Sequence, residues 1–93
     1  MRPDYERRMI DLLHDAARDQ YADWRCEAET VSLAYATWRT AGPDGRADAH
    51  TGYCAALEQE ELAARVYAEI VGSLDAAIAE RQERTSVTTA PRA

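Results

Sequence analysis

Apolar side chains recur every seven residues in two long segments of the chain. In the first segment, one apolar line runs from Ile10 to Trp38, and a second line lies four residues after it. The second segment repeats the pattern between Tyr53 and Ile78. Because residues three and four apart share one side of an α-helix, the pattern predicts two helices, each with an apolar seam. The predicted seam consists of Ile10, Ala17, Tyr21, Trp24, Val31, Tyr35, Trp38, Tyr53, Leu57, Ala64, Tyr67, Val71, Leu74 and Ile78.

Helix-starting and helix-breaking residues set the expected boundaries. Pro3 and Asp4 suit a helix start, and the cluster from Ala41 to Gly45 combines Gly, Pro and Asp, which favour a turn. Thr, Val and Pro near the end do not favour a helix. We therefore expect one domain over residues 1–84, with helices at 4–40 and 47–84 and a turn at 41–46, followed by a disordered tail at 85–93.

The predicted fold is all-α, an antiparallel hairpin of two long, coiled-coil-like helices. Folding at the turn pairs residues whose numbers sum to about 88, so that seam positions meet throughout. This register places Tyr35 opposite Tyr53 and Tyr21 opposite Tyr67, as aromatic contacts. Each helix would span ~37 residues, or roughly 55 Å at about 1.5 Å per residue.

A second apolar row lies outside the predicted seam. Such a row would be an exposed apolar patch in a lone hairpin, and patches of this kind mark interfaces. We therefore expect a homodimer or larger assembly, with a four-helix bundle as the favoured arrangement. The predicted interface residues are Met9, Leu12, Leu13, Leu62, Val66 and Ile70.

Composition narrows the classes of partner. The net charge of −6 disfavours binding to nucleic acid and to anionic membranes, because both require positive charge. No apolar run approaches the ~20 residues of a membrane span, and the first residues do not resemble a signal peptide. We expect a cytoplasmic protein whose partners are its own copies and another helical or basic protein. The absence of Lys beside abundant Ala and Arg is typical of a GC-rich bacterial genome.

Glu60 is the one acidic residue on a predicted seam line. A lone buried carboxylate is costly, and its pKa rises unless it is paired, which is typical of functional acids. A tyrosine hydroxyl or Arg25 could satisfy Glu60 instead. A structural role is favoured over a catalytic one.

Two weak patterns suggest a metal or small ligand. Asp11 and His14 resemble in spacing the Glu-x-x-His element of carboxylate-bridged metal bundles. The chain has Asp where that element has Glu, and it lacks a second copy. His50 and Cys54 share a helix face, but two ligands are too few for a structural zinc site, which needs four. We expect no cofactor and no enzymatic activity, since no phosphate-binding loop, Ser-His-Asp set or Cys-x-x-Cys motif is present.

An acidic ladder recurs every four residues in the first segment. Like charges at this spacing destabilise a helix by a few tenths of a kcal/mol per pair, roughly. The ladder is either a solvated face, moderated by nearby arginines, or a site for a basic partner or a hard cation. Its members are Asp11, Asp15, Asp19, Asp23 and Glu27.

The hairpin length and a Trp near the turn resemble the secreted helical-hairpin partners of type VII secretion. The Trp-x-Gly of that family is here Trp38-Arg39-Thr40, and no Tyr-x-x-x-acid signal follows near the end. The resemblance implies a helical-hairpin secretion partner. From the residues themselves, the leading hypothesis is a non-enzymatic module that acts through helix association. The alternative is a metal- or small-ligand-binding four-helix bundle that uses Glu60, His14 and neighbouring acids.

Overall fold

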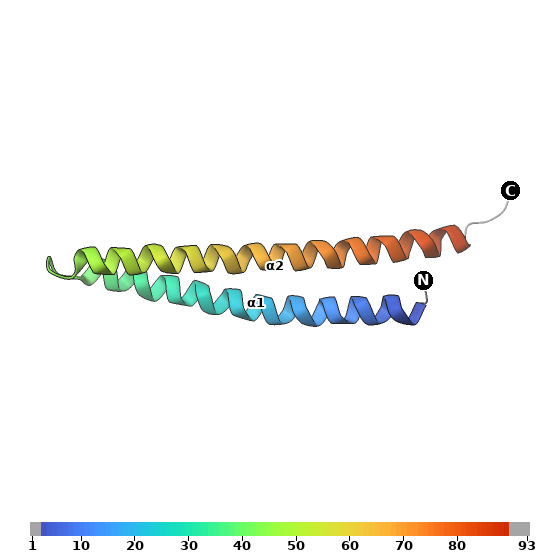
Figure 1. Ribbon diagram of the computed structural model, residues 1–93, viewed down its shortest axis with the longest axis horizontal. Helices are drawn as coiled ribbons and strands as arrows, with labels where there is room; N and C mark the ends of the chain where they lie inside the picture. Colours follow the sequence, from blue (N-terminus) through green and yellow to red (C-terminus); the bar gives the residue numbers. More distant parts are fainter. Residues whose placement is uncertain (1–2, 90–93) are drawn as a thin grey trace.

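Helices α1 (Pro3–Thr40) and α2 (Arg46–Thr89) run antiparallel in the computed structural model, joined by a short turn (Figure 1). The structure describes the backbone of residues 3–89 and the side chains of residues 4–85. No strand occurs within this part of the chain, and the all-α hairpin is confirmed. Neither helix contains, in the same range, a stretch that is long and apolar enough to cross a membrane.

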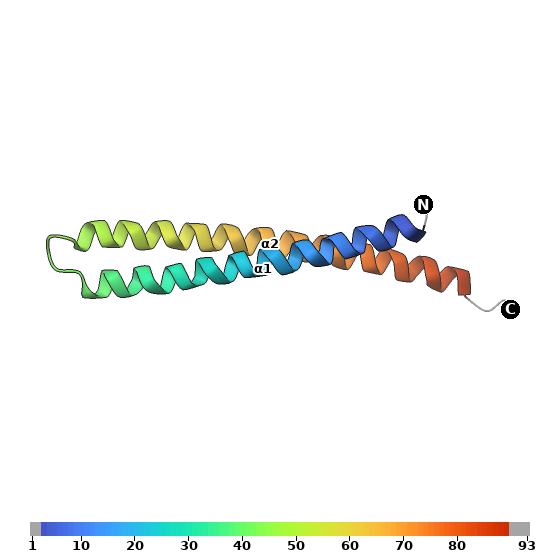
Figure 2. The ribbon, with the colours of Figure 1, turned by 90° about the horizontal axis from the view of Figure 1, so that it is seen from below.

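The helices lie side by side near the turn and cross at a shallow angle toward their free ends (Figure 2). The resulting rod measures 77 × 24 × 14 Å. Its Cα radius of gyration is 21.2 Å. A compact domain of this length would have a radius of gyration of about 12 Å. The fold is therefore a single layer of two helices, in which each helix covers only one side of its neighbour.

The turn is closed by local backbone hydrogen bonds. Ala41 donates to the carbonyl of Trp38 over 3.3 Å, and Gly45 donates to the carbonyl of Gly42 over 3.1 Å. Pro43 cannot continue α1, because proline lacks the backbone N–H that a helix needs. The helix boundaries at this end agree with the sequence prediction to within one residue.

The prediction for the second helix end is wrong for residues 85–89. Helix α2 continues to Thr89, whereas the sequence predicted a disordered tail after residue 84. The Ser, Thr and Val residues there disfavour helix by only a few tenths of a kcal/mol each, roughly, which is too little to end a helix that is already formed. Residues 90–93 of the predicted tail lie outside the described part.

The seam between the helices consists of two lines of residues on each helix, and one of these two lines is shifted by one position from the predicted line. The lines that contain Trp24 and Tyr67 are in the seam as expected. On each helix, the line three residues after them is more buried than the predicted line four residues after them, although the predicted Ala64, Val71 and Ile78 are also half-buried. On α1 the half-buried and buried seam residues are Glu6, Ile10, Leu13, Ala17, Gln20, Trp24, Glu27, Val31, Ala34 and Trp38. On α2 they are Ala49, Tyr53, Ala56, Glu60, Ala63, Tyr67, Ile70, Leu74 and Ala77.

Small side chains explain this difference. Ala56 and Ala63 are among the most buried residues, whereas the neighbouring Leu57, a predicted seam residue, is 39% exposed. Small residues let two helix backbones approach closely, so the larger Leu57 is left at the edge of the contact. On α1, Gln20 takes a seam position, and its Nε2 donates to the carbonyl of Ala63 over 3.2 Å.

Candidate interaction surfaces

An aromatic cluster joins the two helices at the middle of the hairpin. The Trp24 ring stacks on Tyr67, with ring centres 5.8 Å apart, and meets Tyr21 edge-on at 5.9 Å. Tyr21 and Tyr67, a pair expected from the sequence, lie 5.6 Å apart. Because aromatic pairs at these distances attract beyond their buried area, the cluster fixes the register of the helices here.

A second aromatic cluster lies beside the turn. Trp38 stacks on Tyr53 at 5.4 Å and meets the His50 ring at 4.8 Å. The predicted contact between Tyr35 and Tyr53 is present at 5.5 Å. The two clusters hold the same register, in which residue numbers of facing pairs sum to about 88.

Glu60 has a partner, so the unpaired state considered from the sequence does not occur. The Trp24 Nε1–H donates a hydrogen bond of 2.6 Å to Glu60 Oε1, and both side chains are half-buried. The partner is therefore neither a tyrosine hydroxyl nor Arg25, which is exposed. This bond makes Glu60 a structural link between the helices.

Replacing Glu60 with Leu should destabilise the hairpin by about 1–2 kcal/mol, because the half-buried Trp24 N–H loses its acceptor. Glu60→Gln, which keeps an acceptor oxygen, should lose less. Chemical unfolding followed by circular dichroism measures both. A Leu variant more stable than the wild type would show that the hydrogen bond contributes nothing to stability.

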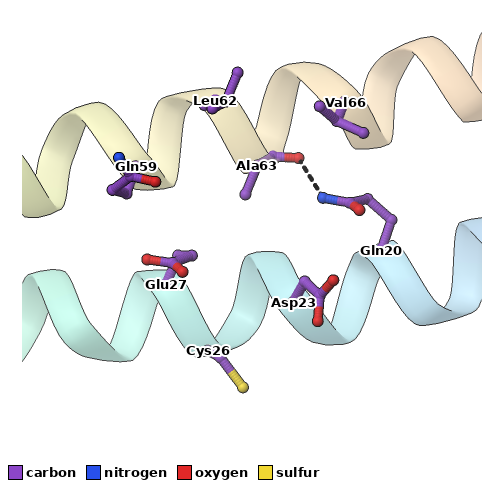
Figure 3. A pocket seen from close by; sticks show the side chains of 8 residues that line it. All are labelled: Gln20, Asp23, Cys26, Glu27, Gln59, Leu62, Ala63 and Val66. Atoms are coloured by element: carbon purple, nitrogen blue, oxygen red, sulfur yellow. Dashed lines mark hydrogen bonds between the residues drawn. The ribbon is translucent and has the colours of Figure 1, made fainter.

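One side of the seam carries an open groove of about 290 Å³ (Figure 3). Asp23 and Glu27 border it from α1, while Gln59, Leu62 and Val66 border it from α2. This side, the groove face, is defined by these five residues together with Met9. It mixes apolar side chains with carboxylates and an amide.

The opposite side of the seam is more apolar. Asp23 and Gln59, which directly precede the seam residues Trp24 and Glu60, border the groove. Residues four positions after the seam lines of Trp24 and Glu60 therefore lie on the other side of the seam. We call this side the tyrosine face. It contains no acidic residue and consists of His14, Tyr21, Ala28, Tyr35, Leu57, Ala64, Val71 and Ile78.

The predicted interface row is divided by the structure. Leu13 and Ile70 belong to the seam between the helices and are half-buried there. Met9, Leu12 and Leu62 are exposed, the last by 51%. Val66 is half-buried at the groove. The sequence argument treated Ile70 as outside the hairpin contact, and its seam position corrects that expectation.

The suggested metal ligands do not converge within the described chain. Asp11 and His14 are exposed on α1, far along the hairpin from the bond that holds Glu60. The His50 ring nitrogens lie 3.8 and 3.9 Å from the Cys54 sulfur, and no third ligand among the described side chains joins them. No group of three or more His, Cys, Asp or Glu side chains suited to a metal occurs among the described residues.

The acidic ladder is mostly solvated. Asp11, Asp15, Asp19 and Asp23 are exposed, whereas Glu27 is half-buried in the seam. The ladder therefore crosses α1 from Asp11, beside the tyrosine face, to Asp23 and Glu27 at the groove.

Cys26 and Cys54 should both react with a thiol reagent in the native protein, because both are free and exposed. The aromatic contacts put them about eight residues out of register, roughly 12 Å along the helix axis. That separation exceeds the limit of about 7 Å for a disulfide. Mass spectrometry should show two labels on the wild type and one on Cys26→Ser or Cys54→Ser. An intrachain disulfide in the unreduced protein would refute this register.

No family model matches the chain, and neither a curated protein nor a solved structure shows significant similarity to it.

Proposed function

We propose that the protein is a non-enzymatic association module that pairs with a second copy of itself through an apolar side of the hairpin, forming a four-helix bundle. The observation that carries this proposal is the large accessible surface of the single hairpin, 7380 Å². A compact monomer of the same mass would expose only about 5,400 Å². The hairpin thus exposes about 2,000 Å² more than expected, whereas a standard interface buries about 800 Å² per partner.

The small number of buried residues supports the same proposal. Only Ile10, Ala56, Ala63 and Leu74 are buried among the described hydrophobic residues, and no large side chain is fully buried. A chain of this size stands near the lower limit at which one core gives useful stability. A second hairpin would cover the exposed apolar side and so complete the core.

Self-association predicts a thermal midpoint that depends on protein concentration, because a partner that binds only the folded state stabilises it by mass action. Thermal unfolding followed by circular dichroism over about a hundredfold range of concentration should show the midpoint rising with concentration. A midpoint independent of concentration over that range would contradict the proposed function.

A further inference from the structure

We propose, building on the proposed function, that the second copy binds on the tyrosine face, about a two-fold axis parallel to the long axis of the hairpin. Both turns then lie at the same end of the bundle. In this arrangement α1 of each copy packs beside α2 of the other.

The apolar character of the tyrosine face is the first argument. Residues from α1 and α2 alternate along this face, from Ile78 at the free ends to Tyr35 near the turn. Only His14 among them is not apolar. Tyr21, Tyr35 and Leu57 are 46%, 41% and 39% exposed. A helix in a bundle faces the common core with an apolar stripe that is broader than the seam of a two-helix coiled coil. Large apolar side chains beside the seam widen the stripe in this way. The groove face instead carries Asp23 and Gln59 on its two edges.

Side-chain sizes along the tyrosine face are complementary between the two helices. On α1 the small Ala28 lies between two large residues, Tyr21 and Tyr35, at spacings of seven. On α2 the small Ala64 lies between Leu57 and Val71. A two-fold axis along the hairpin keeps each residue at its own level. Tyr21 of one copy then faces the Ala64 level of the other, and Ala28 faces the Leu57 level, as close packing requires.

The two borders of the tyrosine face also differ in charge. The border on α1, formed by the residues directly after the seam line of Trp24, carries Arg18, Arg25 and Arg39, with two acidic residues, Asp4 and Asp11, toward the free end, and all five are exposed. The α2 border carries two acidic residues, Glu61 and Asp75, and no basic residue. The α1 border is therefore positive and the α2 border negative.

These charges select the orientation of the second copy. With the axis along the hairpin, Arg25 of each copy lies beside Glu61 of the other at the centre of the face, whereas Asp11 lies beside Asp75 nearer the free ends. With the axis across the hairpin, α1 would lie beside α1, and at the centre of the face Arg25 would lie beside Arg18 or Arg25 of the other copy. Like charges in direct contact disfavour that alternative, since electrostatic complementarity sets orientation at interfaces.

Arg25 and Glu61 form the central pair of this match. They directly follow Trp24 and Glu60, which share a hydrogen bond, so they lie at the same level of the hairpin. In the proposed dimer, Arg25 of each copy is beside Glu61 of the other copy. Within one copy Glu61 bonds to Arg65 over 3.3 Å, but that pair is largely exposed and leaves Glu61 accessible.

The face is tested with a matched pair of substitutions. Leu57→Glu on the tyrosine face should raise the dimer dissociation constant by about tenfold or more. Leu62→Glu, the same change five residues away on the other side, should leave it within about threefold. Analytical ultracentrifugation measures the constants, and circular dichroism verifies that both variants remain helical. The reverse result, with Leu62→Glu dissociating the dimer and Leu57→Glu not, would overturn the proposed face.

The orientation is tested with spin labels on the turn. Asp44→Cys in the Cys26→Ser, Cys54→Ser background carries one label per copy, at an exposed turn position. Turns at the same end predict a distance between labels of about 20–30 Å, from helix spacings of 8–10 Å. Turns at opposite ends would separate the labels by nearly the full length of 77 Å. The long distance would overturn the proposed orientation while leaving self-association intact.

Exchanging the charges of Arg25 and Glu61 tests the orientation a second time and leaves the apolar side chains unchanged. Arg25→Glu alone should weaken the dimer by about threefold to tenfold, and combining it with Glu61→Arg should restore the affinity. A stronger dimer with Arg25→Glu alone would show that α1 faces α1. If the wild type forms no dimer at all, the proposed function itself fails, and the two failures are thereby distinguished.

Discussion

Trp24→Ala should lower the free energy of unfolding by about 3 kcal/mol, near the lower end of the range for truncating a large aromatic residue, because the side chain is half-buried. The substitution removes the stack on Tyr67, the edge contact with Tyr21 and the hydrogen bond to Glu60. The stack on Tyr67 and the bond to Glu60 hold α1 against α2 at mid-length, whereas the Tyr21 contact lies within α1. A hairpin with so few buried residues has little other packing to compensate for their loss.

Leu33→Ala is the matched control for this prediction. Leu33 also lies on α1, but 71% of its surface is exposed, so its truncation should change stability by no more than about 0.5 kcal/mol. Denaturant unfolding at a fixed protein concentration compares the two variants. Equal losses for Trp24→Ala and Leu33→Ala would mean that the aromatic cluster does not hold the helices together.

Ala56→Glu should destabilise the hairpin by about 2–4 kcal/mol, because it places an unpaired carboxylate in the buried part of the seam. Ala56 is 8% exposed, and its small side chain lies between the two helices. A longer side chain there must either separate the helices or bury its charge.

The neighbouring Ala55 supplies the control, since it is exposed on the same helix. Ala55→Glu introduces the same residue and should leave the unfolding free energy within about 0.5 kcal/mol of the wild type. If Ala55→Glu were the damaging change, the seam would lie on a different side of α2. The pair therefore tests the register correction directly, in the same unfolding measurement.

The two helices and the turn were predictable because their signals are strong and local. Long runs without proline predict helices, and the Gly, Pro and Asp cluster predicts the turn. The contacts of Tyr21 with Tyr67 and of Tyr35 with Tyr53 followed from the same register. These features depend on helix geometry alone, which the spacing of apolar residues reports well.

The composition of the seam was harder to predict, for a physical reason. Apolar patterning gives most weight to large residues, so Leu57 was placed in the seam in preference to Ala56. In the hairpin, Ala56 and Ala63 are the buried residues, and polar Gln20 enters the seam because its side chain bonds to the Ala63 carbonyl. Neither close approach nor a specific hydrogen bond is visible in a hydropathy pattern.

The misplaced residues are themselves informative. Tyr21, Tyr35 and Leu57 were assigned to the seam by their apolar pattern, yet a single hairpin leaves them exposed by 39% or more. Apolar residues at these exposed positions are expected in a bundle in which a second hairpin covers them. The same pattern thus leads from the hairpin to its proposed self-association.

The solution mass of the native protein tests this account most directly. Light scattering of the purified protein at tens of micromolar should give twice the chain mass of 10.4 kDa. A monodisperse species at 10.4 kDa under the same conditions would contradict the account, because the tyrosine face would then remain exposed to water.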